Sequence, residues 1–410
     1  MSDSLARPIL FVLNSGFPDY SGGRENWLFH VATRLAQRGH DVRILSMARY
    51  GGQPPHYDLG NAVRLYRIRS WLHTLPGQLA TPGPLAVLRI LSVVPRFHGF
   101  LRRRACRWQP RPIVVGLDTV VAPLAMRGLE RELIFVCASK GPHAEVLAEH
   151  APWLASWLRR TEIRAFRDCR ELWSNGDDMR AAIQAQGFDS VLIGNGVDTA
   201  AARRPRACPP EYGTDRSRFR LAMAGSLLDI KGVPNAVRAL GLVSDPAQRR
   251  RMDMFFVGKG DPRRYAALAA ACGVGAQIHF LGARQDVFPY LQHADLLLGL
   301  SGGGGMSMAA LESLAAGVPL LAWDTPVYRQ LVVAGQTGWL VPAADDHALA
   351  RGIVRAMALP AAERRRMGER AAESVRAYDW ERVVDHVETR LHHMGGQEHP
   401  AHAPEGNATT

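Results

Sequence analysis

The sequence lacks a run of apolar residues long enough to span a bilayer. A transmembrane helix needs about 18 or more of them in succession, and no part of the 410-residue chain supplies such a run. The segment from Met1 to Pro8 also lacks the basic and then apolar order of a secretory signal. These absences predict a chain without a transmembrane helix and a cytoplasmic location.

Cysteine is also scarce. The five cysteines are odd in number, lie far apart and include no CxxC pair. A disulfide framework requires paired cysteines, and a zinc site requires clustered ligands. We therefore expect neither a disulfide nor a metal site, and we expect the thiols to be reduced. The five residues are Cys106, Cys137, Cys169, Cys208 and Cys272.

Acidic residues are absent between Asp58 and Asp118. This stretch holds ten arginines, which account for 10 of the formal net charge of +12, interleaved with aromatic and aliphatic residues. Such a mixture suits an anionic bilayer surface, where each basic residue contributes about 1 kcal/mol. We expect a membrane-surface patch at Arg102, Arg103 and Arg104. An ordinary arginine-rich surface remains an alternative. No recognition motif accompanies the charge, so nucleic acid is not expected as a partner.

The chain alternates between apolar strands and amphipathic helices, and it does so twice. Residues 9–13 form a continuous apolar run, typical of a strand buried on both faces. A helix is predicted over 24–38 and a second strand over 42–45, and this order implies a parallel sheet with right-handed crossovers. The Pro- and Arg-rich stretch 201–217 is typical of an interdomain linker. Further strands are predicted at 113–115, 133–136, 171–174, 191–193, 219–223, 254–257, 278–281, 295–300 and 318–322.

The pattern predicts an α/β protein with two Rossmann-like, doubly wound domains. The expected boundaries are 1–200 for the first domain and 218–377 for the second. A final helix over 378–394, anchored by Trp380, is expected to pack back on the first domain, and the polar tail 395–410 is expected to be disordered. Ligands of such sheets bind beyond the carboxyl ends of the strands, so two facing sheets would share a cleft there.

The most informative segment is a glycine run between a predicted strand and a predicted helix. It includes Gly304 and Gly305 and is followed by Met306 and Ser307. Glycines allow the backbone to approach an anion closely, and a helix start presents unpaired N–H groups, so the segment suits a pyrophosphate. Glu312, further along the same helix, can accept hydrogen bonds from ribose hydroxyls. A flexible turn with a surface glutamate is the alternative.

Two other loops carry glycine at a predicted helix start. After the first strand of the second half, Lys231 precedes a glycine, and a lysine there can neutralise a phosphate as a point charge. Gly22 and Gly23 place amides at the first helix of the chain. Neither this loop nor the loop around Gly258 contains GxGxxG, so a dinucleotide-binding fingerprint is not supported.

Several of these pieces, in this order, resemble the motifs of glycosyltransferase family 4, whose members are retaining enzymes of GT-B fold. The resemblance spans about residues 9–387. The similar segments are Asn195–Asp198 (NGVD), Phe256–Pro262 (the VGxGP-like loop), Phe280–Gly282 (FLG), Leu311–Pro319 (the LEAMACGxPV-like run) and Tyr378–Trp380 (aromatic-x-Trp).

The resemblance implies a GT-B fold, with two Rossmann-like domains facing across a cleft, and a retaining transfer from a UDP- or GDP-sugar. Lys231 would bind the donor diphosphate and act in catalysis, and Glu312 would bind the ribose. Backbone amides at Met306 and Ser307 would bind the phosphates. No metal or cofactor is expected, because lysine and helix amides take that role. The other donor-side residues would be Gly22, Gly23, Ser226, Gly258, Gly304 and Gly305.

Two positions depart from the family pattern. Ser226 stands where the family has arginine, and Gly304 stands where it has its first glutamate. That glutamate normally contacts the donor sugar. On the acceptor side, His143 follows a predicted strand, where the family often places a catalytic histidine.

The acceptor is expected to be a hydroxyl of a glycan or lipid-linked sugar, as in bacterial envelope polysaccharide or glycolipid synthesis. The protein would then lie in the cytoplasm, with peripheral contact to the inner face of the membrane. Three alternatives stay open. They are a non-catalytic partner subunit, which Ser226 and Gly304 favour, a glycosyltransferase for small molecules, and another enzyme class on this fold, such as an epimerase.

Overall fold

The computed structural model describes residues 5–15, 17, 22–47, 56–58, 63–68, 91–130, 132–139, 152–215, 217–302 and 306–396. The chain forms two compact units. Unit 1 comprises Met1–Asn175, Arg180–Ile193 and Val384–Thr410, and unit 2 comprises Gly176–Met179 and Gly194–Val383. The chain passes into unit 2 after Ile193 and returns to unit 1 at Val384, so the expected boundaries after 200 and before 378 lie a few residues from the observed ones.

Unit 1 is built on an eight-stranded sheet in the order β3-β4-β2-β1-β5-β6-β7-β8. Every pair is parallel except β3 with β4. All five residues of β1 are buried, as their continuous apolar run predicts. The strands are β1 (Ile9–Leu13), β2 (Val42–Met47), β3 (His56–Asp58), β4 (Arg64–Ile68), β5 (Ile113–Gly116), β6 (Ile134–Ser139), β7 (Glu171–Ser174) and β8 (Val191–Leu192).

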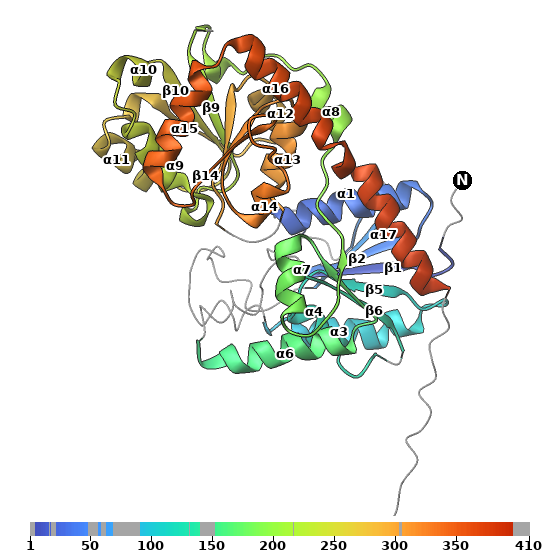
Figure 1. The fold of residues 1–410 in the computed structure, drawn as a ribbon. Helices are drawn as coiled ribbons and strands as arrows, with labels where there is room; N and C mark the ends of the chain where they lie inside the picture. Colours follow the sequence, from blue (N-terminus) through green and yellow to red (C-terminus); the bar gives the residue numbers. More distant parts are fainter. Residues whose placement is uncertain are drawn as a thin grey trace, which may run out of the picture. The chain divides into compact units, whose positions relative to one another are not determined.

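Helices cover both faces of this sheet. Helices α3, α4 and α6 form a layer on one face, while α1 and the end of α17 lie on the other (Figure 1). Asp118 lies just before α4, and its buried carboxylate accepts hydrogen bonds from the backbone N–H groups of Val120 and Ala122. The helices are α1 (Gly23–Gln37), α3 (Val94–Arg103), α4 (Val121–Met126), α6 (Ala155–Asp168), α7 (Asp177–Gln184) and α17 (Trp380–Gly395).

The last turns of α17 are fastened to unit 1 by charged side chains. Glu388 accepts hydrogen bonds from Arg38 Nη1 (2.7 Å) and from His40 Nε2 (2.6 Å). Arg390 pairs with Glu171 at the start of β7. Because His40 and Glu388 are buried, removing either partner would leave the other without its hydrogen bond, which is strongly destabilising.

The aromatic residues of the basic stretch that the structure describes fill the interior of unit 1. Phe97 and Leu101 on α3 are fully buried. Phe100 and Trp108 pack around Tyr66 of β4, with ring centroids 5.1 and 6.1 Å from it. The expectation of a mixed arginine and aromatic surface is therefore wrong for α3, because its apolar side chains face the sheet. Arg102, Arg103 and Arg104 remain exposed.

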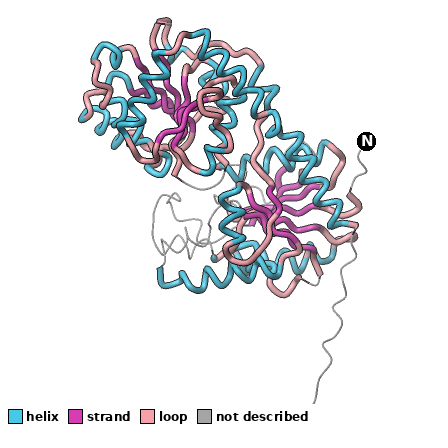
Figure 2. Tube along the Cα trace, viewed as in Figure 1, coloured by secondary structure: helices cyan, strands magenta, loops and turns pink. Residues whose placement is uncertain are grey.

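Unit 2 is built on a six-stranded sheet in the order β11-β10-β9-β12-β13-β14, with every pair parallel. Figure 2 shows this sheet enclosed by helices. Side chains alternate between two cores along the strands, so that Leu221 of β9 faces one and Ala222 the other. The strands are β9 (Phe219–Ala224), β10 (Met252–Val257), β11 (Ile278–Gly282), β12 (Leu296–Gly299), β13 (Leu320–Trp323) and β14 (Gly338–Val341).

The helices of unit 2 divide between its two cores. Helices α9, α11 and α15 contribute to the first core, whereas α8, α12, α13 and α14 contribute to the second. The helices are α8 (Thr199–Arg203), α9 (Val233–Gly241), α10 (Pro246–Arg250), α11 (Arg263–Ala271), α12 (Phe288–Gln292), α13 (Met308–Ala315), α14 (Pro326–Arg329), α15 (Asp346–Ala358) and α16 (Ala361–Ser374). Within the described residues of both units, no helix is long and apolar enough to cross a membrane.

The stretch 201–217 is not a free linker. Tyr212 is buried, stacks on Phe255 with ring centroids 4.1 Å apart, and donates a hydrogen bond to the carbonyl oxygen of Tyr290 (2.7 Å). Arg220 donates to the backbone oxygen of Tyr212 (3.1 Å). The polar composition of this stretch predicted a linker. The stretch is instead part of unit 2, because its buried Tyr212 packs on Phe255.

Candidate active site

Three loops of unit 2 meet beyond the carboxyl ends of its central strands. They follow β9, β10 and β12, and β9 lies between the other two in the sheet. The loop after β9 donates to the loop after β10 through Leu227 N and Lys259 O (2.8 Å). It also accepts at Ile230 O from Gly302 N, in the loop after β12 (2.9 Å). These backbone hydrogen bonds assemble one polar edge from segments far apart in the sequence.

Glycine is required where these loops touch. A Cβ atom on Gly258 would lie 1.7 Å from the carbonyl oxygen of Gly225, so two backbones meet there with no room for a side chain. Gly232 has a positive φ of 78°, and its Cβ would lie 2.4 Å from Cβ of Leu300. The glycine after Lys231 therefore lets the chain turn into α9 directly against the end of β12.

Lys231 lies where the loops after β9 and β12 meet. It ends a 3₁₀ turn (Asp229–Lys231), and its Nζ donates to Ser301 Oγ (3.2 Å). Desolvation lowers the pKa of Lys231, although the residue as a whole is exposed. Asp229, two residues earlier, pairs with Arg264 (2.6 Å). The half-buried Ser226 lies on the same loop.

A second lysine occupies the neighbouring loop. The chain contains only three lysines, against 47 arginines, and Lys231 and Lys259 are two of them. Lys259 lies between Gly258 and Gly260, and its backbone oxygen accepts the hydrogen bond from Leu227. The motif comparison missed Lys259, although the scarcity of lysine in the sequence was a signal that could have found it.

Tyr328 fixes both ends of the loop that precedes α13. This buried residue of α14 accepts a hydrogen bond at its Oη from Ser301 N (3.2 Å) and also bonds the Ser307 side chain. Burial raises the pKa of Tyr328, so its hydroxyl stays protonated. Ser307 also caps α13 by accepting from Ala310 N (3.3 Å). Sequence reasoning missed Tyr328, because nothing near it in the chain identifies its partners.

Met306 contributes its backbone, and not its side chain, to the site. Its side chain is buried, and its carbonyl oxygen accepts a hydrogen bond from Asn195 Nδ2 (2.7 Å). Asn195 belongs to the NGVD-like segment, which the structure assigns to unit 2. The segment thus orients the chain just before α13.

Glu312 faces no partner of its own. It lies one turn into α13 and is half-buried, and its carboxyl group has no hydrogen bond or ion pair with any residue that the structure describes. Burial, with a smaller contribution from the charge of Asp286, raises the pKa of Glu312 to about 7. A half-buried carboxyl group without a partner can accept hydrogen bonds from the hydroxyl groups of a ligand.

The remaining candidates are less constrained by the structure. Gly22 and Gly23 start α1 in unit 1; Gly22 has an extended φ of −136°, and a Cβ on Gly23 would meet nothing within 4 Å. Neither glycine is therefore demanded by backbone conformation. Gly304, Gly305 and His143 lie outside the described residues. Arg284, another arginine of unit 2, donates hydrogen bonds to Glu211 Oε1 (2.9 Å) and to Tyr290 Oη (2.7 Å).

One group of side chains in unit 1 has the composition of a metal site. Ligand atoms of His40, Glu388 and His392 lie within 4.8 Å of one another. However, Leu5 N donates to His40 Nδ1 (3.0 Å), so the ring proton is on Nε2, where it bonds Glu388. This pattern leaves His40 no lone pair for an ion, and we interpret the group as the clamp that holds α17.

Comparisons with known proteins agree with this architecture. Two family models match, Glycosyltransferase Family 4 over residues 21–201 and Glycosyl transferases group 1 over residues 209–374. The chain is 29% identical over 384 residues to the phosphatidyl-myo-inositol mannosyltransferase of Mycobacterium leprae, covering 90% of this chain and 92% of the relative.

Two solved structures share the fold at low sequence identity. Sucrose-phosphate synthase from Thermosynechococcus elongatus has a TM-score of 0.79 at 18% identity and covers 95% of this chain and 99% of that one. Anabaena Alr3699/HepE in complex with UDP-glucose has a TM-score of 0.68 at 17% identity, covering 94% and 99%. The two Rossmann-like units, the order of their motifs and the two matching models show that the chain is a glycosyltransferase of GT-B fold that belongs to glycosyltransferase family 4.

Proposed function

We propose that the protein transfers a hexose from a UDP- or GDP-sugar to a hydroxyl group of a glycan or lipid-linked acceptor, with retention at the anomeric carbon. The observation that carries this proposal is the polar edge of unit 2. There, Lys231 meets Ser301, and the unpartnered carboxyl group of Glu312 lies on the helix that follows the same loop. Anabaena Alr3699/HepE, solved in complex with UDP-glucose, shares this fold.

Each residue at this edge has a role in the proposed reaction. The bond between the sugar and the diphosphate breaks, and negative charge builds on the departing diphosphate. Lys231, the amides at Met306 and Ser307 and the glycines Gly304 and Gly305 stabilise that charge without a metal ion or cofactor. Lys259, on the adjoining loop, supplies a second cation where Ser226 replaces arginine. Glu312 accepts hydrogen bonds from the ribose.

On the acceptor side, the proposal rests on unit 1. Gly22 and Gly23 offer backbone amides to the donor phosphates, and His143 is the candidate that acts on the acceptor hydroxyl. The relative named for phosphatidyl-myo-inositol, together with the exposed Arg102, Arg103 and Arg104, supports a membrane-proximal acceptor. The protein would then work in the cytoplasm, against the inner face of the membrane, in envelope glycan or glycolipid synthesis. Nucleic acid has no part in this function.

Calorimetric titration of UDP, GDP and ADP, and of the matching sugar nucleotides, tests the proposal. We expect one of the three nucleotides to bind and the other two not to bind. The base of the nucleotide that binds identifies the donor class. NMR of the product from that donor and an acceptor glycan then reports the anomeric configuration. If no nucleotide binds, the proposal is wrong and a non-catalytic partner subunit becomes the better account of Ser226.

The affinity for the nucleotide is expected to depend on pH through Glu312. Its pKa of about 7 means that the carboxylate, which accepts ribose hydroxyls, is lost as the pH falls through 7. The dissociation constant should therefore rise up to about tenfold between about pH 8 and pH 6. Glu312→Gln should bind more weakly at pH 8 and show little of this slope. An unchanged slope in Glu312→Gln would assign the titration to another group.

A further inference from the structure

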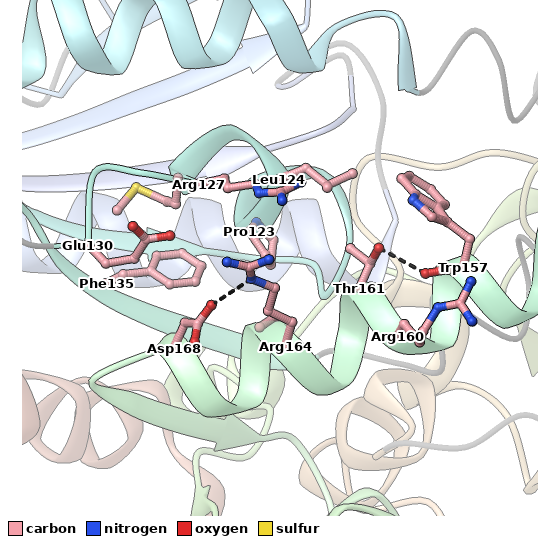
Figure 3. A pocket seen from close by; sticks show the side chains of 12 residues that line it. Pro123, Leu124, Arg127, Glu130, Phe135, Trp157, Arg160, Thr161, Arg164 and Asp168 are labelled. Atoms are coloured by element: carbon pink, nitrogen blue, oxygen red, sulfur yellow. Dashed lines mark hydrogen bonds and ion pairs between the residues drawn. The ribbon is translucent and has the colours of Figure 1, made fainter. Parts of the chain in front are cut away.

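Unit 1 contains a pocket that the donor chemistry does not use. It has a volume of about 170 Å³ and lies between α4 and α6, against Phe135 of β6 (Figure 3). Leu124 and Met126 of α4, Ala165 of α6 and Phe135 give it an apolar lining. An apolar lining of this size suits part of a lipid or another amphiphile better than a free sugar.

Three arginines line the same pocket. Figure 3 shows Arg127 and Arg164 reaching the pocket from opposite sides, and Arg160 beside Trp157. Arg164 pairs with Asp168 (3.1 Å). Among the residues that the structure describes, neither Arg127 nor Arg160 has an ion-pair partner. Glu130 and Asp168 also line the pocket, so the three guanidinium groups leave an excess of positive charge beside its apolar side chains, which complements an anionic head attached to an apolar body.

Tryptophan is exposed at this place in unit 1. Eight of the nine tryptophans lie in described residues, and of these only Trp153 and Trp157 are exposed, at 66% and 37%. They stand four residues apart where the chain enters α6, and Arg160 and Arg164 follow at helical spacing. Exposed tryptophan beside arginine is typical of side chains at the boundary between lipid and water.

We propose that this surface, formed by Trp153, Trp157, Arg127, Arg160 and Arg164, is a binding site for anionic phospholipid at a bilayer surface. The lipid phosphate would lie between Arg127 and Arg160, and the two indole rings would enter the interface. The site extends the membrane-proximal acceptor of the proposed function. Arg102, Arg103 and Arg104 lie in the same helix layer and add attraction without apolar contact.

Vesicle flotation of the full chain tests the charge component. The wild type should float with phosphatidylcholine vesicles that contain phosphatidylglycerol and should remain behind with pure phosphatidylcholine. Arg127→Gln/Arg160→Gln should weaken partitioning about 30-fold at low salt, since each basic residue at such a surface contributes about a factor of five. Arg355→Gln/Arg366→Gln in unit 2 removes the same charge from exposed positions and should change partitioning little.

Quenching of tryptophan fluorescence by brominated phosphatidylglycerol tests the insertion. Wild type should be quenched, and Trp153→Phe/Trp157→Phe should lose most of that quenching. The proposal would be overturned if the two double glutamine variants partitioned equally onto the vesicles. It would also be overturned if quenching persisted in Trp153→Phe/Trp157→Phe. Binding to a DNA duplex that is lost in Arg127→Gln/Arg160→Gln would also overturn it, by assigning the surface to nucleic acid. Nucleotide titration of the same variants, which should match wild type, separates a failure here from a failure of the donor site.

Discussion

Replacing Lys231 with alanine is expected to reduce turnover about a hundred- to a thousandfold. Removing one preorganised group that stabilises transition-state charge costs about 2.7–4 kcal/mol. Lys231 lies at the junction of two loops, held by Ser301, and its neighbour Asp229 is already paired with Arg264. The ammonium group is therefore available to a departing diphosphate. Transfer from the donor identified by titration, followed by release of nucleoside diphosphate, measures the effect.

The comparison variants separate catalysis from charge and from folding. Lys231 is exposed, so Lys231→Ala should unfold at the same temperature as wild type. Arg250→Ala, on the exposed end of α10, removes one positive charge from the same unit and should leave turnover unchanged. Lys259→Ala should reduce turnover less than Lys231→Ala. Turnover in Lys231→Ala within a few-fold of wild type would remove this lysine from the mechanism.

Replacing Gly258 with alanine is expected to destabilise unit 2 severely. The new Cβ would lie 1.7 Å from the carbonyl oxygen of Gly225, and backbone cannot rotate out of the way as a side chain can. Overpacking of this kind should cost about 3 kcal/mol or more, which lowers the melting temperature by about 6–12 °C for a unit of this size. The loops after β9 and β10 would separate, so nucleotide binding should fall too.

Gly275→Ala is the matched control for this substitution. It lies in the same unit, and the nearest atom to its new Cβ would be 3.8 Å away, an ordinary contact. Thermal unfolding followed by circular dichroism, with nucleotide titration below the transition, measures both effects. If Gly258→Ala and Gly275→Ala had the same melting temperature, the close approach of the two loops would not be essential to the site.

The sequence could identify residues whose role follows from their place in the chain. Lys231 and Glu312 belong to motifs whose order and spacing are local; the structure places Lys231 against Ser301 and places Glu312 on the helix that follows the same loop. Tyr328 could not be found in this way. Its hydroxyl group meets Ser301 and Ser307, and only the fold brings α14 next to that loop.

The basic stretch shows the opposite limit. Arginine and aromatic residues alternate there in a way that favoured a membrane surface, yet Phe97 and Leu101 are fully buried, whereas the arginines of α3 face solvent. The exposed tryptophans instead lie where the chain enters α6, with Trp153 in the turn before the helix and Trp157 in its first turn. Composition reports which residue types are present, but burial decides which of them reach the surface.

The clamp around Glu388 delays the completion of unit 1 until unit 2 has been synthesised. Glu388 of α17 is the hydrogen-bond partner of Arg38 and His40. It leaves the ribosome only after the 190 residues from Gly194 to Val383 have been made. At about 5–20 residues per second, this delay lasts about 10 to 40 s. During that interval the nascent first unit has every strand of its sheet but no covering from α17. The apolar surface that Val387 and Leu391 of α17 share with unit 1 in the finished protein is then the part of the molecule most in need of a chaperone.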